Sequence, residues 1–183
     1  MPSVNTKRIE ESATTALKAA LLRCPILESY IDSNDKTPSW DGTVFVYKSE
    51  KTKKEDLAGR VPIQIKGTTK VIISDTATFL CRVSDLKNYY KDGGCVFFLV
   101  SVDLSSGKSR IFYKTLLVVD LDKIIKDAGK QDKITIHLNL FPTEANEISS
   151  IFMQFTDNVH KQMGFIGKNI PTFESLEANG AEI

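Results

Sequence analysis

Three side chains of this 183-residue chain have the types and spacing of a polar reaction site. Asp41 opens an apolar, aromatic-rich run, and Gln64 and Lys66 alternate with isoleucines in the run 61–66. Alternate side chains of a strand share a face, so Gln64 and Lys66 are expected on the face opposite the isoleucines. A carboxylate, an amide oxygen and an ammonium at adjacent strand ends suit a hard cation and an anionic substrate.

Simpler interpretations stay open for each of these residues. Gln64 and Lys66 fit the solvated face of a half-exposed sheet, and Asp41 with the glycine after it fits an ordinary turn. A hairpin from Asp41 to Lys66 would bring Asp41 close to both polar side chains of the second strand. Glu10 shares its side of a predicted helix with Ala13, Leu17 and Leu21, although an acidic first turn is also favoured by the helix dipole.

The elements that would position these residues follow from hydrophobic periodicity and turn signals. Helices are predicted at 6–23, 84–91, 121–128 and 144–163, and strands at 43–48, 61–66, 71–74, 79–83 and 133–138. A hairpin is predicted from two nearly continuous apolar runs, 95–104 and 110–121, which are typical of buried strands. This order predicts an α/β fold (an α+β sandwich) with a mixed central sheet flanked by helices.

Composition narrows the class of protein. The 24 basic and 23 acidic residues give a net charge of +1, which argues against a protein that coats nucleic acid passively. The three cysteines and two histidines are isolated, so a disulfide framework, a thiolate zinc site or a Ser–His–Asp triad has little to build on. Without a bilayer-spanning apolar stretch or a signal-peptide core, we expect a soluble, cytoplasmic protein that makes no membrane contact.

Taken together, these motifs resemble the PD-(D/E)xK nuclease superfamily in its QxK variant, with a helical Glu10, then Asp41-Gly42 opening a hairpin, then Gln64-x-Lys66-Gly67. Within it, the chain is similar to the bacterial domain-of-unknown-function 4365 group. That similarity rests on PIQIKGT at 62–68, Asp85-Leu86 with Tyr89-Tyr90, FFLVSVD at 97–103 and IFY at 111–113. The resemblance spans roughly residues 8–128 and implies a restriction-endonuclease-like core in a domain at 1–163. Residues 164–183 lose the periodicity and are expected to form a C-terminal tail, a linker toward a further domain or a docking segment.

The activity that the resemblance implies is metal-dependent hydrolysis of DNA phosphodiester bonds, in the effector domain of a bacterial antiviral defence system. Asp41 would be the principal Mg²⁺ ligand, joined by the Gln64 side-chain oxygen and the Ile65 backbone carbonyl, and Mn²⁺ would substitute for Mg²⁺. Lys66 would orient the attacking water or stabilise charge on the phosphate, and Glu10 would hold a second metal ion or one of its waters. Cutting both strands needs two sites, so a homo-oligomer is expected, with additional regulatory or sensor domains.

Binding of DNA would depend on local positive charge. Seven basic residues lie between 48 and 70, against three acidic ones. Lys51, Lys53, Lys54 and Lys70 are the expected contacts to the DNA backbone, although a solvated hairpin tip would have the same composition. The alternative function is a catalytically silent nuclease-like module for nucleic-acid binding or oligomerisation, and a plain structural module is a third hypothesis.

Overall fold

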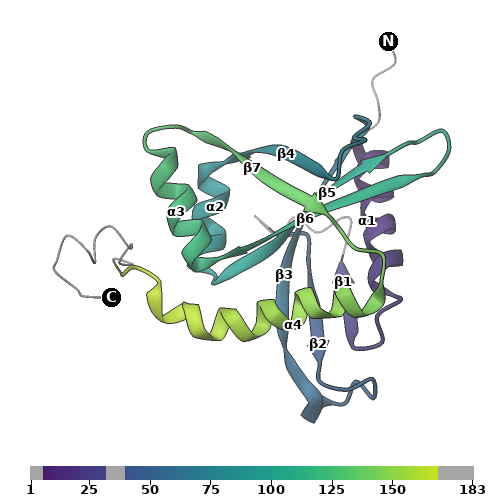
Figure 1. The fold of residues 1–183 in the computed structure, drawn as a ribbon, viewed down its shortest axis with the longest axis horizontal. Helices are drawn as coiled ribbons and strands as arrows, with labels where there is room; N and C mark the ends of the chain where they lie inside the picture. Colours follow the sequence, from purple (N-terminus) through teal and green to yellow (C-terminus); the bar gives the residue numbers. More distant parts are fainter. Residues whose placement is uncertain (1–5, 32–39, 169–183) are drawn as a thin grey trace.

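A seven-stranded mixed sheet organises the computed structural model, which describes residues 6–31 and 40–168 (Figure 1). In chain order its strands are β1 (Leu27–Ile31), β2 (Gly42–Tyr47), β3 (Leu57–Thr68), β4 (Thr76–Arg82), β5 (Gly94–Val102), β6 (Ser109–Leu117) and β7 (Lys133–Leu140). The α-helices are α1 (Thr6–Leu21), α2 (Val83–Lys91), α3 (Val118–Ala128) and α4 (Ala145–Gln162), and two short 3₁₀ helices are η1 (Lys54–Asp56) and η2 (Met163–Phe165). The predicted α/β fold with a mixed sheet is therefore confirmed.

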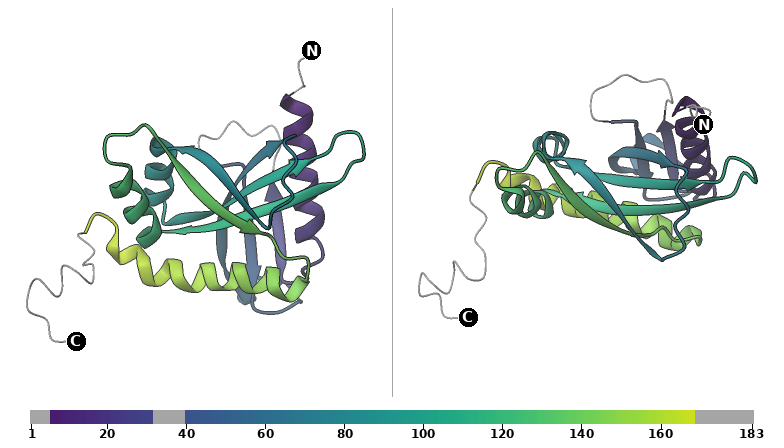
Figure 2. Two further views of the ribbon diagram at one scale, coloured as in Figure 1. Left: turned by 45° about the horizontal axis from the view of Figure 1, so that its top comes forward. Right: turned by 90° about the horizontal axis from the view of Figure 1, so that it is seen from above.

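The strand that carries Gln64 and Lys66 lies inside the sheet. The strand order is β1-β2-β3-β5-β6-β7-β4, in which β2 is antiparallel to β1 and β3, and β5 is parallel to β3. Only Phe112↔Leu140 and Tyr113↔Asn139 pair β6 with β7. Beyond these pairs, β7 and its partner β4 cross over β5 and β6, so the sheet folds over itself (Figures 1 and 2).

Two apolar clusters fill the two faces of this folded sheet. On one face, α1 and α4 pack on β1, β2, β3 and β5, with Leu17, Ile63 and Phe152 fully buried. On the other face, β4, β7, α2 and α3 enclose a second cluster around Phe97 and Leu116. Every residue of β5 is buried because both of its faces are covered, which explains its continuous apolar run.

The structure corrects several predicted boundaries. The strand β1 was not predicted, and residues 71–74, predicted as a strand, form an irregular loop instead. Strand β3 begins at Leu57 rather than at residue 61, so the connection from β2 is shorter than the sequence suggested. The helix α3 begins at Val118, which takes the end of the second apolar run out of the hairpin. The other predicted elements are confirmed with small changes at their ends.

The segment after α4 stays in contact with the domain for its first residues. The helix η2 follows α4 directly, and the Gly167 N–H donates a hydrogen bond to the Tyr90 hydroxyl at 2.9 Å. The remainder of the predicted tail, 169–183, lies outside the described residues. None of the helices in the described ranges is both long enough and apolar enough to cross a membrane.

Candidate functional site

Asp41 and Gln64 meet where β2 begins and β3 approaches its end. The Asp41 N–H donates to the Ile63 carbonyl at 3.0 Å, which places Asp41 across the hairpin from Gln64. The Gln64 Nε2 group donates to Asp41 Oδ2 and also to the Ile65 carbonyl, at 3.3 Å. The Ile65 N–H donates to the same Asp41 oxygen at 2.7 Å. The predicted proximity of Asp41 and Gln64 is confirmed.

The alternation of faces along β3 is also as predicted. Ile63 and Ile65 belong to the cluster under α1, whereas Gln64 and Lys66 lie on the opposite face. Gln64 is only 3% exposed, so the interpretation of a solvated glutamine is wrong. Lys66, by contrast, is exposed at the margin of the same face.

The residue Gly42 has a packing role in addition to its place after Asp41. A Cβ at this position would lie 2.5 Å from the Tyr30 carbonyl oxygen and 2.8 Å from the Ile31 Cα. Glycine therefore lets β1 approach the start of β2, in a paired strand rather than in the turn that an Asp-Gly pair suggests. This close approach fixes the backbone from which the Asp41 side chain projects.

An aromatic pair closes the site from the side of α2. The Tyr89 hydroxyl donates to Gln64 Oε1 at 3.3 Å, and the Trp40 ring meets the Tyr89 ring edge-on at 6.0 Å. Burial raises the pKa of Tyr89 far above its usual value, so this hydroxyl stays protonated and remains a donor. Both ends of the Gln64 amide are thus held, and its burial is compensated by hydrogen bonds.

Lys66 lies within electrostatic range of a buried thiol on β4. Burial and, to a smaller extent, Asp85 raise the pKa of Cys81 to about 11, and the Lys66 ammonium acts in the opposite direction. Cys24, Cys81 and Cys95 are all buried and free. The neutral Cys81 thiol leaves Lys66 as an exposed cation without an ion pair among the described residues.

Within the described residues, Glu10 makes no hydrogen bond or ion pair with the Asp41–Gln64 pair. The helix α1 packs through Ala13 and Leu17 on the face of the sheet opposite Gln64, and Glu10 is exposed on that helix. Glu10 shares the side of α1 that buries Ala13, Leu17 and Leu21, as predicted, although it is itself exposed near the N-terminal end of the helix. Its role in holding a second metal ion stays a prediction.

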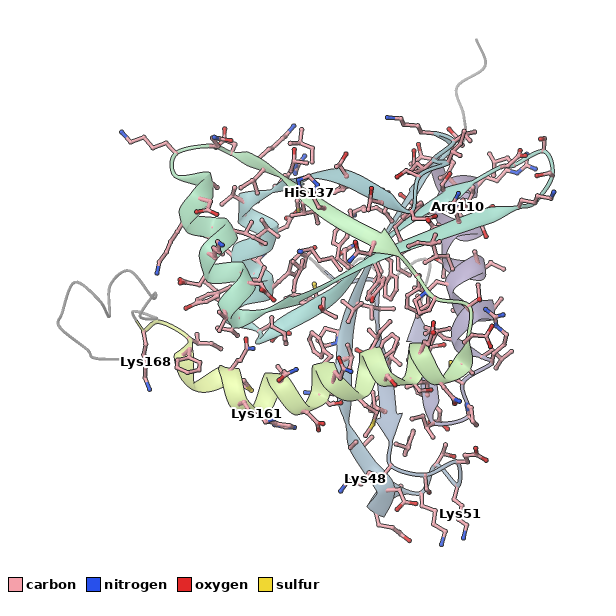
Figure 3. The ribbon with its side chains drawn as sticks, in the orientation of Figure 1. Lys48, Lys51, Arg110, His137, Lys161 and Lys168 are labelled. Atoms are coloured by element: carbon pink, nitrogen blue, oxygen red, sulfur yellow. The ribbon has the colours of Figure 1, made fainter. Side chains whose placement is uncertain are left out.

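The lysines predicted to contact DNA fall into two separate places. Lys51, Lys53 and Lys54 are exposed around the free end of the β2–β3 hairpin, where Figure 3 labels Lys48 and Lys51. The paired residues of β2 separate this end from Asp41 by about 20 Å, at roughly 3.3 Å per residue over the six steps to Tyr47. Lys70 is exposed just beyond the opposite end of β3, on the side of Lys66.

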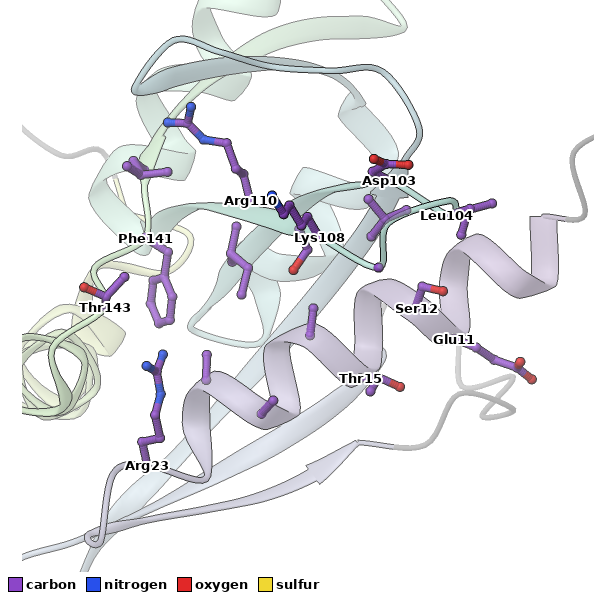
Figure 4. Close-up of a pocket in the computed structure, with 18 of the residues that line it drawn as sticks. Glu11, Ser12, Thr15, Arg23, Asp103, Leu104, Lys108, Arg110, Phe141 and Thr143 are labelled. Atoms are coloured by element: carbon purple, nitrogen blue, oxygen red, sulfur yellow. The ribbon is translucent and has the colours of Figure 1, made fainter.

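A large groove lies on the other face of the sheet. It has a volume of about 1120 Å³ and runs between α1, the β5–β6 turn and the connection from β7 to α4 (Figure 4). Arg23 and Arg110 lie at its rim over an apolar floor that includes Phe141. None of the predicted site residues lines this groove.

The oxygen atoms of Asp41, Gln64 and Ile65 would coordinate a divalent cation if the Gln64 amide were turned over. The amide now turns its nitrogen toward Asp41 Oδ2 and the Ile65 carbonyl, and a half-turn about its last bond would place Oε1 there instead. Carboxylate, amide and carbonyl oxygens are the ligands that Mg²⁺ and Mn²⁺ take. Within 6–31 and 40–168, no three His, Cys, Asp or Glu side chains come together in a group that could hold a metal ion.

Two contributors to the site were not assigned a role from the residues. Tyr89 entered only through the motif resemblance, and Trp40 was given no role. The available signal was the spacing of Val83, Leu86 and Tyr89, which marks the buried face of α2.

Comparisons of this chain with protein families, with curated proteins and with solved structures found no match.

Proposed function

We propose that the protein is a metal-dependent endonuclease that hydrolyses DNA phosphodiester bonds, as the effector domain of a bacterial defence system. The observation that carries the proposal is the convergence of Asp41, Gln64 and the Ile65 carbonyl on one point beside the exposed Lys66. These are the groups that the motif resemblance assigns to the site. Their placement on β2 and β3, with β5 parallel to β3, also supports a restriction-endonuclease-like core.

Each group has a separate part in the proposed reaction. Asp41, the Ile65 carbonyl and the turned Gln64 amide would hold Mg²⁺ or Mn²⁺, which supplies Lewis-acid stabilisation of the charge that develops on the phosphate. The Ile65 N–H keeps the Asp41 carboxylate in place, and the Tyr89 hydroxyl, which now donates to Oε1, would accept a hydrogen bond from Nε2 of the turned amide. The Lys66 ammonium reaches the solvent side, where it orients the attacking water or neutralises charge on the scissile phosphate.

The test is cleavage of supercoiled plasmid with Mg²⁺ or Mn²⁺ by the wild type and by Asp41→Ala and Lys66→Ala. We expect loss of either side chain to slow cleavage by about 10²–10³-fold, the range typical for a group that stabilises developing charge. Matched controls are Asp157→Ala and Lys161→Ala, exposed on α4, which packs on the opposite face of the sheet. Equal cleavage by all five proteins would contradict the proposed site, and circular dichroism shows whether each variant is folded.

A second candidate is the silent module that binds nucleic acid without cutting it. The orientation of Gln64 favours it, because the amide nitrogen already satisfies Asp41 and the Ile65 carbonyl without a cation. Duplex binding by the wild type with no cleavage in Mg²⁺ or Mn²⁺ would select this candidate. Cleavage that depends on Asp41 would exclude it.

A further inference from the structure

The loop between β3 and β4 presents two aliphatic side chains to solvent. Val71 is 75% exposed and Ile73 is 83% exposed, while Ile72 between them packs against the second apolar cluster. The loop follows the Gln64-x-Lys66 strand directly, and together with β4 it borders a pocket of about 510 Å³ that reaches Leu99, the pairing partner of Lys66. Exposed apolar groups at a fixed place of this kind mark an interaction surface.

Hydrogen bonds from two neighbouring strands hold the backbone of this loop. The Ser101 hydroxyl of β5 donates to the Lys70 carbonyl at 2.7 Å. Arg110 of β6 donates to the Ile73 carbonyl at 2.6 Å and pairs with the Asp75 carboxylate at 2.9 Å, and Figure 3 labels it beside the loop. Val71 and Ile73 are therefore held outward by an anchored, alternating backbone, with Ile72 as the inward side chain.

The charges around the loop indicate the chemistry of its partner. Lys66 and Lys70 are exposed cations with no ion pair in the described part of the chain, and Arg110 neutralises the acidic Asp75. Two exposed aliphatic side chains in the loop that follows Lys66 and contains Lys70 are complementary to a polyanion with an apolar interior. Duplex DNA has this character, with phosphates outside and stacked bases inside, and aliphatic side chains inserted between base steps are a known mode of binding it.

We propose that Val71 and Ile73 form a wedge that inserts between base steps of duplex DNA bound beside Lys66. The proposal rests on the proposed function, since the DNA is the substrate of that site. Lys66 and Lys70 hold the flanking phosphates, and the two aliphatic side chains unstack the step next to them. The wedge would present a deformed backbone to Lys66 and would favour flexible steps, which unstack most easily.

The experiment uses the full chain without divalent metal and duplexes that carry 2-aminopurine, whose fluorescence rises when the base is unstacked. We expect the wild type to raise this fluorescence severalfold, and the Val71→Ser/Ile73→Ser variant to leave it near the free-duplex level. Affinity by fluorescence anisotropy should fall about tenfold, because the apolar area buried by the two side chains offsets part of the unstacking energy. The matched control is Leu22→Ser/Leu80→Ser, which changes residues that are 86% and 57% exposed and lie outside the loop.

Three results would overturn the wedge: no binding of duplex by the wild type, binding without a change in fluorescence, or the same fluorescence with the loop variant. A wild type that sediments as a dimer and a loop variant that sediments as a monomer would assign the loop to contact between copies instead. A fluorescence rise without plasmid cleavage in Mg²⁺ or Mn²⁺ would support the wedge and contradict the nuclease. Plasmid cleavage with unchanged 2-aminopurine fluorescence would support the nuclease and contradict the wedge.

Discussion

At the scale of single residues, the two ends of the Gln64 amide decide what the site can do. Its nitrogen now donates to Asp41 and to the Ile65 carbonyl, and its oxygen accepts from Tyr89. This arrangement satisfies a buried amide without any ligand. In the proposed nuclease, a bound cation has to compete with it, so the affinity for metal depends on how firmly this network holds the amide.

Replacing Gln64 with Glu tests this balance directly. Gln64→Glu puts a second carboxylate beside Asp41 at a position that is 3% exposed, so the two negative charges should destabilise the metal-free protein. A divalent cation would relieve this repulsion and gain a stronger ligand. We expect a lower melting temperature without metal and a larger rise on adding Mg²⁺ or Mn²⁺ than the wild type shows, since binding to the folded state stabilises it.

The control for this experiment is Gln154→Glu, an exposed position on α4 that makes the same change of charge away from the site. A Gln64→Glu variant whose melting temperature responds to metal no more than that control would contradict the cation site.

The positions of single residues at the site were predicted from the sequence more fully than the elements were. Strand alternation placed Gln64 and Lys66 on one face, and the hairpin brought Asp41 to Gln64, because both rules depend only on local geometry. The burial of Gln64 could not be predicted from β3 alone. It depends on Tyr89 of α2, which is 25 residues away in sequence.

At the scale of elements, the glycine after Lys66 controls how closely α1 approaches β3. A Cβ at Gly67 would lie 2.7 Å from the Ile9 Cγ2 atom and 3.0 Å from the Ile9 carbonyl oxygen. The second of these neighbours is backbone, so the helix itself has to move. The glycine in the Gln64-x-Lys66-Gly67 motif therefore has a packing role on the face opposite the candidate site.

A Gly67→Ala variant should lower the free energy of unfolding by about 1–3 kcal/mol, the usual range for overpacking a well-packed interface. Urea denaturation measures the change. Gly164→Ala is the matched control, because a Cβ there meets nothing within 4 Å. Equal stability of both variants would show that α1 is not held against β3 at this distance.

Sequence patterns missed the strand β1 and wrongly predicted a strand at 71–74. The strand β1 is short, and a polar Ser29 between the buried Leu27 and Ile31, with an aromatic Tyr30 on the exposed face, obscures the alternation. Residues 71–74 have the composition of a strand, yet Arg110 holds the Ile73 carbonyl and Ser101 holds the Lys70 carbonyl just before them, in place of a strand ladder. β-Propensity describes how well side chains fit a pleated, half-buried surface, whereas a strand also needs a free edge with which to pair.

At the scale of the whole molecule, the charge is unevenly distributed along the chain. Residues 1–119 have 18 basic and 13 acidic residues, a net +5, and residues 120–183 have 6 basic and 10 acidic residues, a net −4. The site strands and the β2–β3 hairpin belong to the basic part, and α3 and α4 belong to the acidic part. In the proposed nuclease, DNA would therefore lie over β3 and its hairpin, away from α3.

The lysines at the hairpin tip test whether DNA extends that far from the site. About 20 Å separates them from Asp41, which corresponds to roughly six phosphates along one strand at 3.4 Å of axis each. If Lys51, Lys53 and Lys54 contact phosphates, their triple replacement by Glu should weaken duplex binding at low salt and reduce the slope of log K against log salt by about 3. Lys53 lies only 3.6 Å from Glu55, but both side chains are more than half exposed, so this ion pair competes only weakly with phosphate contacts.

The control replaces the exposed Lys123, Lys130 and Lys133 with Glu, an identical change of total charge at α3 and the start of β7. An equal loss of affinity in both triple variants would mean that net charge, and not a tract along the hairpin, governs binding.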